Sequence, residues 1–237
     1  MLNQDEIGVF HRRDEGGGSA MTERVFPDRR EAGKLLARAL AHYAGREDVV
    51  VLGLPRGGVP VAAEVAQSLG APLDVLIVRK LGAPGQEELA IGAIAEGGVR
   101  VLNREMVANL GLTRDDIDEL ARREERELRR RVQLYRGGGK PLPVADRTVI
   151  VIDDGVATGA TMRAGLQTVR ARGAALVVAA APVGAADAVD ALREDADEVV
   201  VLETPAWFHA VGQWYEDFGQ TSDEEVQACL AAQGGMR

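Results

Sequence analysis

Five apolar runs recur along the chain and predict its strands. They cover residues 48–54, 73–78, 149–152, 175–183 and 198–202. The run Val149–Ile152 consists of four β-branched residues, which is typical of a strand buried on both faces of a parallel sheet. A further, shorter strand is indicated at residues 91–95.

Segments with helical periodicity lie between these runs. They cover residues 28–43, 59–69, 113–135, 159–172, 185–192 and 223–232. Asp28 caps the first of them and Glu31 follows three positions later, which predicts a capping box. Because strands alternate with helices, the pattern predicts an α/β fold with a twisted, mostly parallel sheet flanked by helices.

The segment at 113–135 differs from the other helices because it is rich in charge. Four acids each precede an arginine by four positions, which stabilises a helix and indicates a solvated face. The pairs are Asp118–Arg122, Glu119–Arg123, Glu125–Arg129 and Glu127–Arg131. We assign this face no chemistry and interpret residues 103–140 as a helical insertion, ended by three glycines at 137–139.

The central run is followed by two acids and by a loop of small residues. Asp153 and Asp154, the acid pair, stand at the carboxyl end of the predicted strand, where open α/β sheets bind their ligands. The loop consists of Gly155, Val156, Ala157, Thr158, Gly159, Ala160 and Thr161. Backbone N–H groups and hydroxyls at a helix N-terminus form an anion site that suits a phosphate monoester. The acids would repel phosphate but can accept hydrogen bonds from a diol, so the implied ligand is a sugar phosphate.

Other interpretations of the acid pair exist. The acids could belong to an ordinary solvated turn, or one of them could be a phosphoryl-transfer aspartate. The second interpretation needs an Asp-x-Asp-x-Thr arrangement, which these acids do not form. The sequence also lacks the Gly-x-x-x-x-Gly-Lys-Ser/Thr motif of P-loop proteins.

Cations follow two other predicted strands. Arg56 lies in the turn after residues 48–54, with Gly57 and Gly58 beside it, and these glycines would let a ligand approach the backbone closely. Arg79 and Lys80 follow residues 73–78 and would point into the same crevice. A helix-capping arginine and a solvated basic turn are the alternatives.

At this point the chain resembles a known family. The apolar run, the Asp-Asp pair and the Thr-Gly-x-Thr loop resemble the motif with which type I phosphoribosyltransferases bind 5-phosphoribosyl-1-pyrophosphate (PRPP). The resemblance covers about residues 22 to 220, and it is greatest to a group of bacterial phosphoribosyltransferases of unassigned nucleophile. It implies the fold of that family, with the acid pair on the ribose hydroxyls and the loop 155–161, hereafter the phosphate loop, on the 5′-phosphate.

The resemblance also implies roles for the cations. Arg56, Gly57, Gly58, Arg79 and Lys80 would bind pyrophosphate, with a strained or cis peptide at Pro55–Arg56. The segment 82–86, which leads to Glu87 and Glu88, would be a mobile loop that closes over the reacting centre and excludes water. A homodimer and a Mg²⁺ ion are further implications.

An aromatic segment near the C-terminus is the candidate pocket for the second substrate. The chain has 4 Phe, 2 Trp and 3 Tyr, and five of these aromatics fall between Trp207 and Phe218. The resemblance implies a variable hood here, at residues 203–237 with the last helix, following a core at 22–202. Trp207 or Phe208 would stack on a base, and Glu216 would join Asp153 and Asp154 in holding the metal. The alternative is a small satellite core that anchors the last helix.

Composition limits where the protein acts. The chain has 237 residues and a net charge of −9, so its overall field does not attract nucleic acid or an anionic membrane. One cysteine and three histidines form neither a disulfide nor a zinc motif. The longest apolar run is too short for a membrane span, and no signal-peptide pattern is present. We expect a cytoplasmic protein, with residues 1–21 as a disordered leader and Met21 as the functional start.

These observations predict a transferase. It would use Mg²⁺ and PRPP to transfer ribose 5-phosphate to a nitrogenous, nucleobase-like small molecule, with release of pyrophosphate. The candidate catalytic residues are Asp153, Asp154, Arg56 and Glu88. A PRPP-sensing regulator without transferase activity is the alternative, although one that acts on nucleic acid should carry a basic patch. A module that binds no ligand would leave the acid pair and the phosphate loop unexplained.

Overall fold

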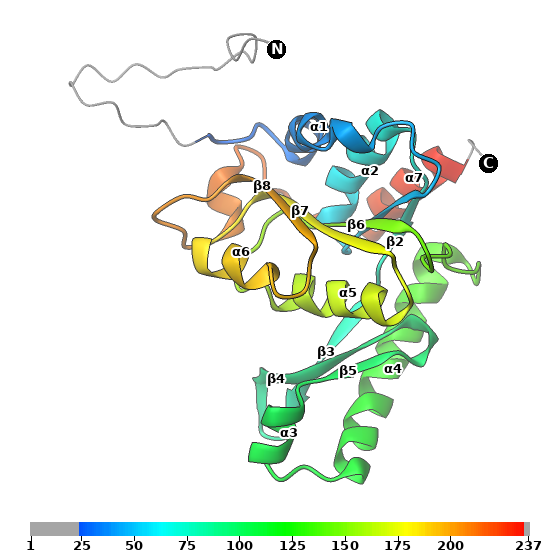
Figure 1. Cartoon of the computed structure of the whole chain (residues 1–237), viewed down its shortest axis with the longest axis vertical. Helices are drawn as coiled ribbons and strands as arrows, with labels where there is room; N and C mark the ends of the chain where they lie inside the picture. The colour runs from blue at the N-terminus through cyan, green and yellow to red at the C-terminus, as the bar shows by residue number, and fades with distance from the viewer. Residues whose placement is uncertain (1–23, 235–237) are drawn as a thin grey trace.

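The computed structural model of the chain (Figure 1) describes residues 24–234, without the side chains of residues 86–90 and 97. The leader expected at residues 1–21, and Met21 as a start, lie outside the described residues. The last three residues of the chain lie outside them as well.

The core is a five-stranded sheet in the order β2-β1-β6-β7-β8. All of its pairings are parallel, which confirms the predicted α/β fold. Every residue of β1 and of β6 is buried, as expected for strands covered on both faces. The strands are β1 (Val49–Gly53), β2 (Leu73–Val75), β6 (Thr148–Ile152), β7 (Leu176–Val183) and β8 (Glu198–Glu203).

Helices cover both faces of this sheet (Figure 1). On one face Val51 of β1 packs in a cluster that includes Leu36 of α1 and Val226 of α7. On the other face Val50 packs in a second cluster with Leu166 of α5. The elements are α1 (Arg29–Ala39), η2 (Ala41–Tyr43), α2 (Gly58–Leu69) and α7 (Asp223–Gly234) on the first face, and α5 (Ala160–Ala171) and α6 (Ala186–Leu192) on the second.

The expected strand at 73–78 is wrong in its extent. β2 ends at Val75, and a second strand, β3 (Val78–Ala83), begins after Leu76 and Ile77. Leu76 is buried in one core cluster and Ile77 in the other, so the apolar run continues through the break between the two strands. Hydrophobicity therefore could not mark where the chain leaves the parallel sheet.

A second, antiparallel sheet begins after this break in the chain. It has the order β3-β4-β5, with β4 (Gln86–Ala95), η3 (Glu96–Gly98) and β5 (Arg100–Leu102). The expected loop at 82–86 is instead a tight turn at Pro84 and Gly85 that closes a hairpin, with Gly85 at a φ of 72°. The strand expected at 91–95 is part of the longer β4.

The long charged helix packs on this second sheet (Figure 1). Thr113 caps α4 (Arg114–Arg136), and α3 (Arg104–Asn109) precedes it. Two of the four expected acid–arginine pairs form, at 3.0 Å for Glu125–Arg129 and at 2.9 Å for Glu127–Arg131. Asp118 instead pairs with Arg100 of β5. The solvated face was therefore predicted correctly in part, but some of its charges hold α4 to the second sheet.

No helix among residues 24–234 combines the length and the apolar character that a membrane crossing requires.

Candidate active site

Two loops meet at the carboxyl edge of the parallel sheet. β1 and β6 are neighbours, with Gly53 opposite Ile152, so the turn 55–58 lies beside the acid pair. Strand order reverses between β1 and β6, because β1 continues to β2 and β6 to β7 on opposite sides. Open α/β sheets bind their ligands at such a switch point.

The two glycines of the turn pack directly against the acid pair. A Cβ atom on Gly57 would overlap the Asp154 carboxylate, lying 2.6 Å from its Cγ. A Cβ atom on Gly58 would lie 2.6 Å from the Ile152 carbonyl oxygen and 2.8 Å from the Asp153 Cα. A side chain at either position would push the two loops apart.

Arg56 is available for an anion. The Pro55–Arg56 peptide is cis, as the family resemblance implied. The Arg56 side chain makes no hydrogen bond or ion pair with any side chain or backbone group described in residues 24–234. Arg56 is half-buried at this turn and its charge acts on the Tyr135 hydroxyl of α4, and its N–H donors remain available to a ligand.

Each carboxylate of the acid pair has one oxygen engaged by the protein. The Asp154 backbone N–H donates to Asp153 Oδ1 at 2.9 Å, and Arg29 Nε donates to Asp154 Oδ2 at 2.8 Å. The Tyr215 hydroxyl donates to the Asp154 carbonyl oxygen at 2.6 Å. The two carboxyls also interact with each other through their side chains, and both stand at the edge of the sheet where a ligand would bind.

Burial and neighbouring charge shift the protonation of this site. Burial raises the pKa of the Asp153 carboxyl well above its ordinary value, and the charge of Asp154 raises it further. Burial also raises the pKa of the Tyr215 hydroxyl, with Asp154 as the second cause. Tyr215 therefore stays protonated and donates to Asp154 throughout the neutral pH range.

The phosphate loop leads into α5 as expected. Gly159 takes a φ of 73° immediately before the helix, a conformation that side chains rarely adopt, and lies against Ala188 of α6. The first N–H groups of a helix have no intrahelical acceptor. Thr158 and Thr161 are exposed beside them. This loop presents hydroxyls and backbone donors to solvent next to the acid pair.

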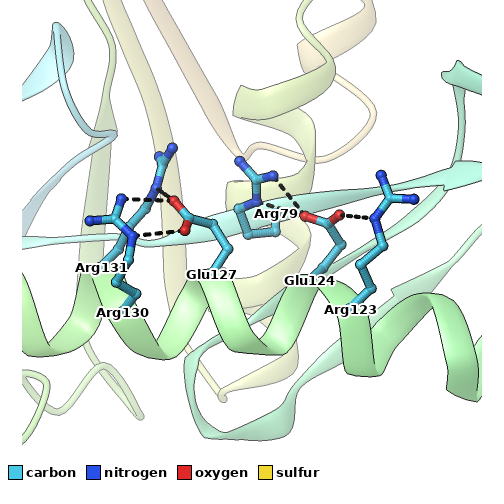
Figure 2. Close-up of polar contacts among 6 residues, drawn as sticks. All are labelled: Arg79, Arg123, Glu124, Glu127, Arg130 and Arg131. Carbon is cyan, nitrogen blue, oxygen red and sulfur yellow. Dashed lines mark hydrogen bonds and ion pairs between the residues drawn. The ribbon is translucent and has the colours of Figure 1, made fainter.

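Arg79 and Lys80 lie elsewhere than predicted. They belong to β3 of the second sheet rather than to the carboxyl edge of the parallel sheet. Figure 2 shows Arg79 paired with Glu124 of α4, at 2.8 Å from Nε and 2.7 Å from Nη2, and Arg123 on the other side of the same carboxylate. These residues line a cavity of about 260 Å³ between the β3–β4 turn and α4, and Lys80 is exposed there.

The two aromatic candidates have different surroundings. Trp207 is 79% exposed. Phe208 is half-buried against a satellite core that joins the N-terminal segment to the chain after β8. That core contains Phe26, Ala32, Val183, Trp214 and Tyr215.

The satellite core does not anchor the last helix, so that alternative is wrong. Val226 and Cys229 of α7 pack in the main core instead. The core holds the N-terminal segment, because the Phe26 N–H donates to the Trp214 carbonyl at 2.8 Å, beside η4 (Val211–Trp214).

The expected metal set does not assemble as a protein-only site. Within the described residues, no group of three or more His, Cys, Asp or Glu side chains is arranged to hold a metal ion. Glu216 is exposed and does not join Asp153 and Asp154 in such a group. The Glu88 side chain lies outside the described set, so its expected role stays a prediction.

Sequence reasoning missed Arg29, Tyr215 and Phe218. Arg29 contacts the acid pair from 125 positions away. Its guanidinium carbon lies 4.0 Å from the centroid of the Phe218 ring. One signal was available: Arg29 is the first residue of α1, where the helix dipole disfavours a cation, so another contact had to stabilise it there.

Comparison with known proteins agrees with this arrangement. The family model described as "Phosphoribosyl transferase domain" matches residues 28–218. Two relatives, from two strains of Mycobacterium tuberculosis, carry the name "Putative phosphoribosyl transferase" and are 54% identical over 207 residues, which is 87% of this chain and 46% of each relative. The chain thus spans about half the length of the curated relatives it matches.

A solved structure shows the same fold. A crystal structure of a Thermus thermophilus protein is 47% identical, with a TM-score of 0.82 over 88% of this chain and 99% of that one. The family model covers the strands, the turn 55–58, the acid pair and the phosphate loop alike. The chain belongs to the phosphoribosyl transferase family.

Proposed function

We propose that the protein is a phosphoribosyltransferase that uses PRPP to transfer ribose 5-phosphate to a nitrogenous, nucleobase-like small molecule. The observation that carries this proposal is the acid pair: two carboxylates stand beside the phosphate loop and the Arg56 turn at the switch point of the sheet. These are the groups that a ribose carrying a phosphate at one end and a pyrophosphate at the other requires.

In this proposal each loop binds one part of PRPP. The phosphate loop takes the 5′-phosphate through backbone N–H groups and the hydroxyls of Thr158 and Thr161. The carboxylates of Asp153 and Asp154 accept hydrogen bonds from the ribose diol. Arg56, with the backbone at Gly57 and Gly58, takes the pyrophosphate.

The transfer is a substitution at the anomeric carbon. The bond from that carbon to the pyrophosphate oxygen breaks, a bond to the nucleophile's nitrogen forms, and the nitrogen loses a proton. Positive charge develops on the sugar and negative charge on the leaving group, by analogy with glycoside chemistry. Arg56 stabilises the leaving pyrophosphate. Asp153, whose pKa burial raises, is a candidate acceptor for the proton, with Asp154 and Glu88 as the other candidates.

Mg²⁺ fits this site as an ion bound jointly with the substrate. Mg²⁺ prefers oxygen ligands and is usually held by one or two carboxylates together with substrate phosphates. Asp153 and Asp154 supply such carboxylate oxygens, whereas Glu216 does not gather with them. The ion would neutralise charge on the pyrophosphate.

Arg79 and Lys80 remain proposed pyrophosphate ligands under one condition. Arg79 has to exchange Glu124 for the pyrophosphate, because its guanidinium is paired in this structure.

Trp207, being exposed, is the better candidate for stacking on the nucleophile, and Phe208 supports it from the satellite core. A homodimer and a cytoplasmic location belong to the same proposal.

The pairing of Arg79 with Glu124 also favours a second candidate function. A protein whose expected pyrophosphate ligand is neutralised by its own carboxylate could bind PRPP and not turn it over. Such a protein would be a PRPP-sensing regulator.

One experiment separates the two functions. The protein is incubated with PRPP, Mg²⁺ and a panel of nucleobases, and pyrophosphate release and PRPP binding are both measured. Base-dependent release supports the transferase, and binding without release supports the sensor. Absence of PRPP binding would contradict both.

The matched variants test the acid pair itself. Asp153→Asn with Asp154→Asn should weaken PRPP binding by at least about tenfold, since one hydrogen bond to a charged group contributes about 1.5–3 kcal/mol. Asp187→Asn with Asp190→Asn makes the same charge change on the exposed side of α6 and should leave binding unchanged. Equal affinities in both double variants would contradict the ribose assignment.

A further inference from the structure

Arg29 reaches the acid pair from the start of α1. Its Nε donates to Asp154 Oδ2 at 2.8 Å, and its Nη1 donates to the Gly219 carbonyl oxygen at 2.7 Å. The side chains of Arg29 and Asp154 are 13% and 14% exposed, so this ion pair is largely shielded from solvent. A shielded charge pair with two directed hydrogen bonds fixes geometry far better than a surface pair does.

Two aromatic rings fix the guanidinium from another side. Its central carbon lies 4.0 Å from the Phe218 ring centroid and 5.9 Å from that of Tyr215, distances at which a cation is attracted to a ring face. The two rings contact each other, with centroids 5.1 Å apart. Tyr215 also donates its hydroxyl to the Asp154 carbonyl. The same aromatic pair therefore holds both Arg29 and the backbone of Asp154.

Asp154 needs such a partner. Two adjacent, partly buried carboxylates repel each other, and a nearby cation offsets that repulsion. The Asp154 carboxylate also sits so close to Gly57 that a side chain there would overlap it. Arg29 engages Oδ2, and the Asp153 carboxyl is the other side-chain neighbour of Asp154, so the ion pair fixes how the Asp154 carboxylate is oriented toward a ligand.

We propose that Arg29 is a positioning residue, which holds Asp154 so that one carboxylate oxygen is presented to a ribose hydroxyl. Arg29 itself touches no substrate in this arrangement. It governs how strongly the site distinguishes a ribose phosphate from a phosphate that lacks ring hydroxyls. The inference rests on the proposed function, because it assigns a ribose to the acid pair.

The test compares two ligands by calorimetry. Ribose 5-phosphate carries the diol, and tetrahydrofurfuryl phosphate keeps the ring and the phosphate without ring hydroxyls. In Arg29→Met the affinity for ribose 5-phosphate should fall by about tenfold or more, as for one lost charged hydrogen bond, while the affinity for tetrahydrofurfuryl phosphate changes less than about twofold. The preference for the diol, which is the ratio of the two affinities, then falls by at least about fivefold.

The neighbouring arginine supplies the control. Arg30 lies one position further along α1, is 53% exposed and pairs with Glu64. Arg30→Met removes the same charge and should leave both affinities unchanged. Arg29→Lys keeps the charge but cannot form the same pair of hydrogen bonds, so its preference should lie between those of the parent and of Arg29→Met. This conservative variant also serves if Arg29→Met fails to fold.

Each outcome decides between explanations. A parent protein that binds both ligands equally refutes the proposed ribose site, and the role of Arg29 with it. A parent with a clear preference for the diol that Arg29→Met retains refutes the positioning role alone. Equal losses for both ligands would show a structural role, which also overturns the proposal. In an Asp154→Asn background Arg29→Met should add no further loss for ribose 5-phosphate.

Discussion

Replacing Arg136 by methionine should destabilise the protein more than any other loss of a single arginine charge on α4. Arg136 is the last residue of α4, and its side chain is 7% exposed. Nε donates to Asp74 Oδ1 at 2.7 Å, Nη2 donates to the Val75 carbonyl at 2.6 Å, and Nη1 pairs with Glu96. Asp74, 8% exposed, also accepts from the Leu142 N–H at 2.9 Å. One guanidinium thus ties α4 to the edge strand β2 and to the turn before β5.

The expected magnitude follows from this burial. Methionine fills a similar volume but leaves the Asp74 and Glu96 carboxylates without their cation in a shielded site. Removing one partner of a buried ion pair costs about 3–5 kcal/mol. Arg130→Met is the matched control: Arg130 is 59% exposed and pairs with Glu127, and a solvent-exposed pair of this kind contributes little to stability.

Urea unfolding followed by far-UV circular dichroism measures both free energies of unfolding. The prediction is a large loss for Arg136→Met and a change near zero for Arg130→Met, with similar slopes against urea concentration. Two small and equal losses would refute the reasoning, because they would show that water reaches the Arg136 pair as freely as it reaches the surface. Adding Asp74→Leu to Arg136→Met should recover part of the lost stability, since no unpaired charge then remains at Asp74.

Three further predictions concern the ligand site. Gly159→Val should weaken ribose 5-phosphate binding more than Thr158→Val, since Gly159 has a φ of 73° and a side chain there distorts the whole loop; equal, mild effects by calorimetry would make the loop structural. Arg56→Ala should reduce PRPP affinity more than ribose 5-phosphate affinity, and equal losses would place its charge elsewhere. Trp207→Ala should raise the nucleophile's KM by roughly 5- to 150-fold at unchanged Tm, whereas Phe208→Ala should lower Tm; the reverse ranking would transfer the stacking role to Phe208.

The parallel sheet could be predicted because its signal is local. Val149–Ile152 is apolar at every position, and only a strand covered on both faces buries four consecutive β-branched residues. The acid pair and the phosphate loop follow directly in the chain. One strand–turn–helix unit therefore brings them together, whatever the rest of the fold does.

The second sheet could not be predicted in the same way. Residues 75–78 form a continuous apolar run in which Leu76 and Ile77 are buried in different core clusters. Periodicity cannot locate a break where both sides of the break are buried. The placement of Arg79 and Lys80 depended on that break, so their expected position at the edge of the parallel sheet was wrong. Their expected role as pyrophosphate ligands requires Arg79 to break its ion pair with Glu124.

Arg29 and Arg56 show where the limit of such reasoning lies. The position of the turn that carries Arg56 was predictable because β1 is adjacent to β6 and both strands end at the same edge of the sheet. Arg29 reaches the same acids from a helix whose docking depends on contacts with Tyr215 and Phe218, which lie far from it in the chain. The need for a cation was nevertheless evident from the sequence, because two adjacent carboxylates in a partly buried site require a counter-charge. An arginine placed at the unfavourable end of a helix dipole is where such a counter-charge should be sought.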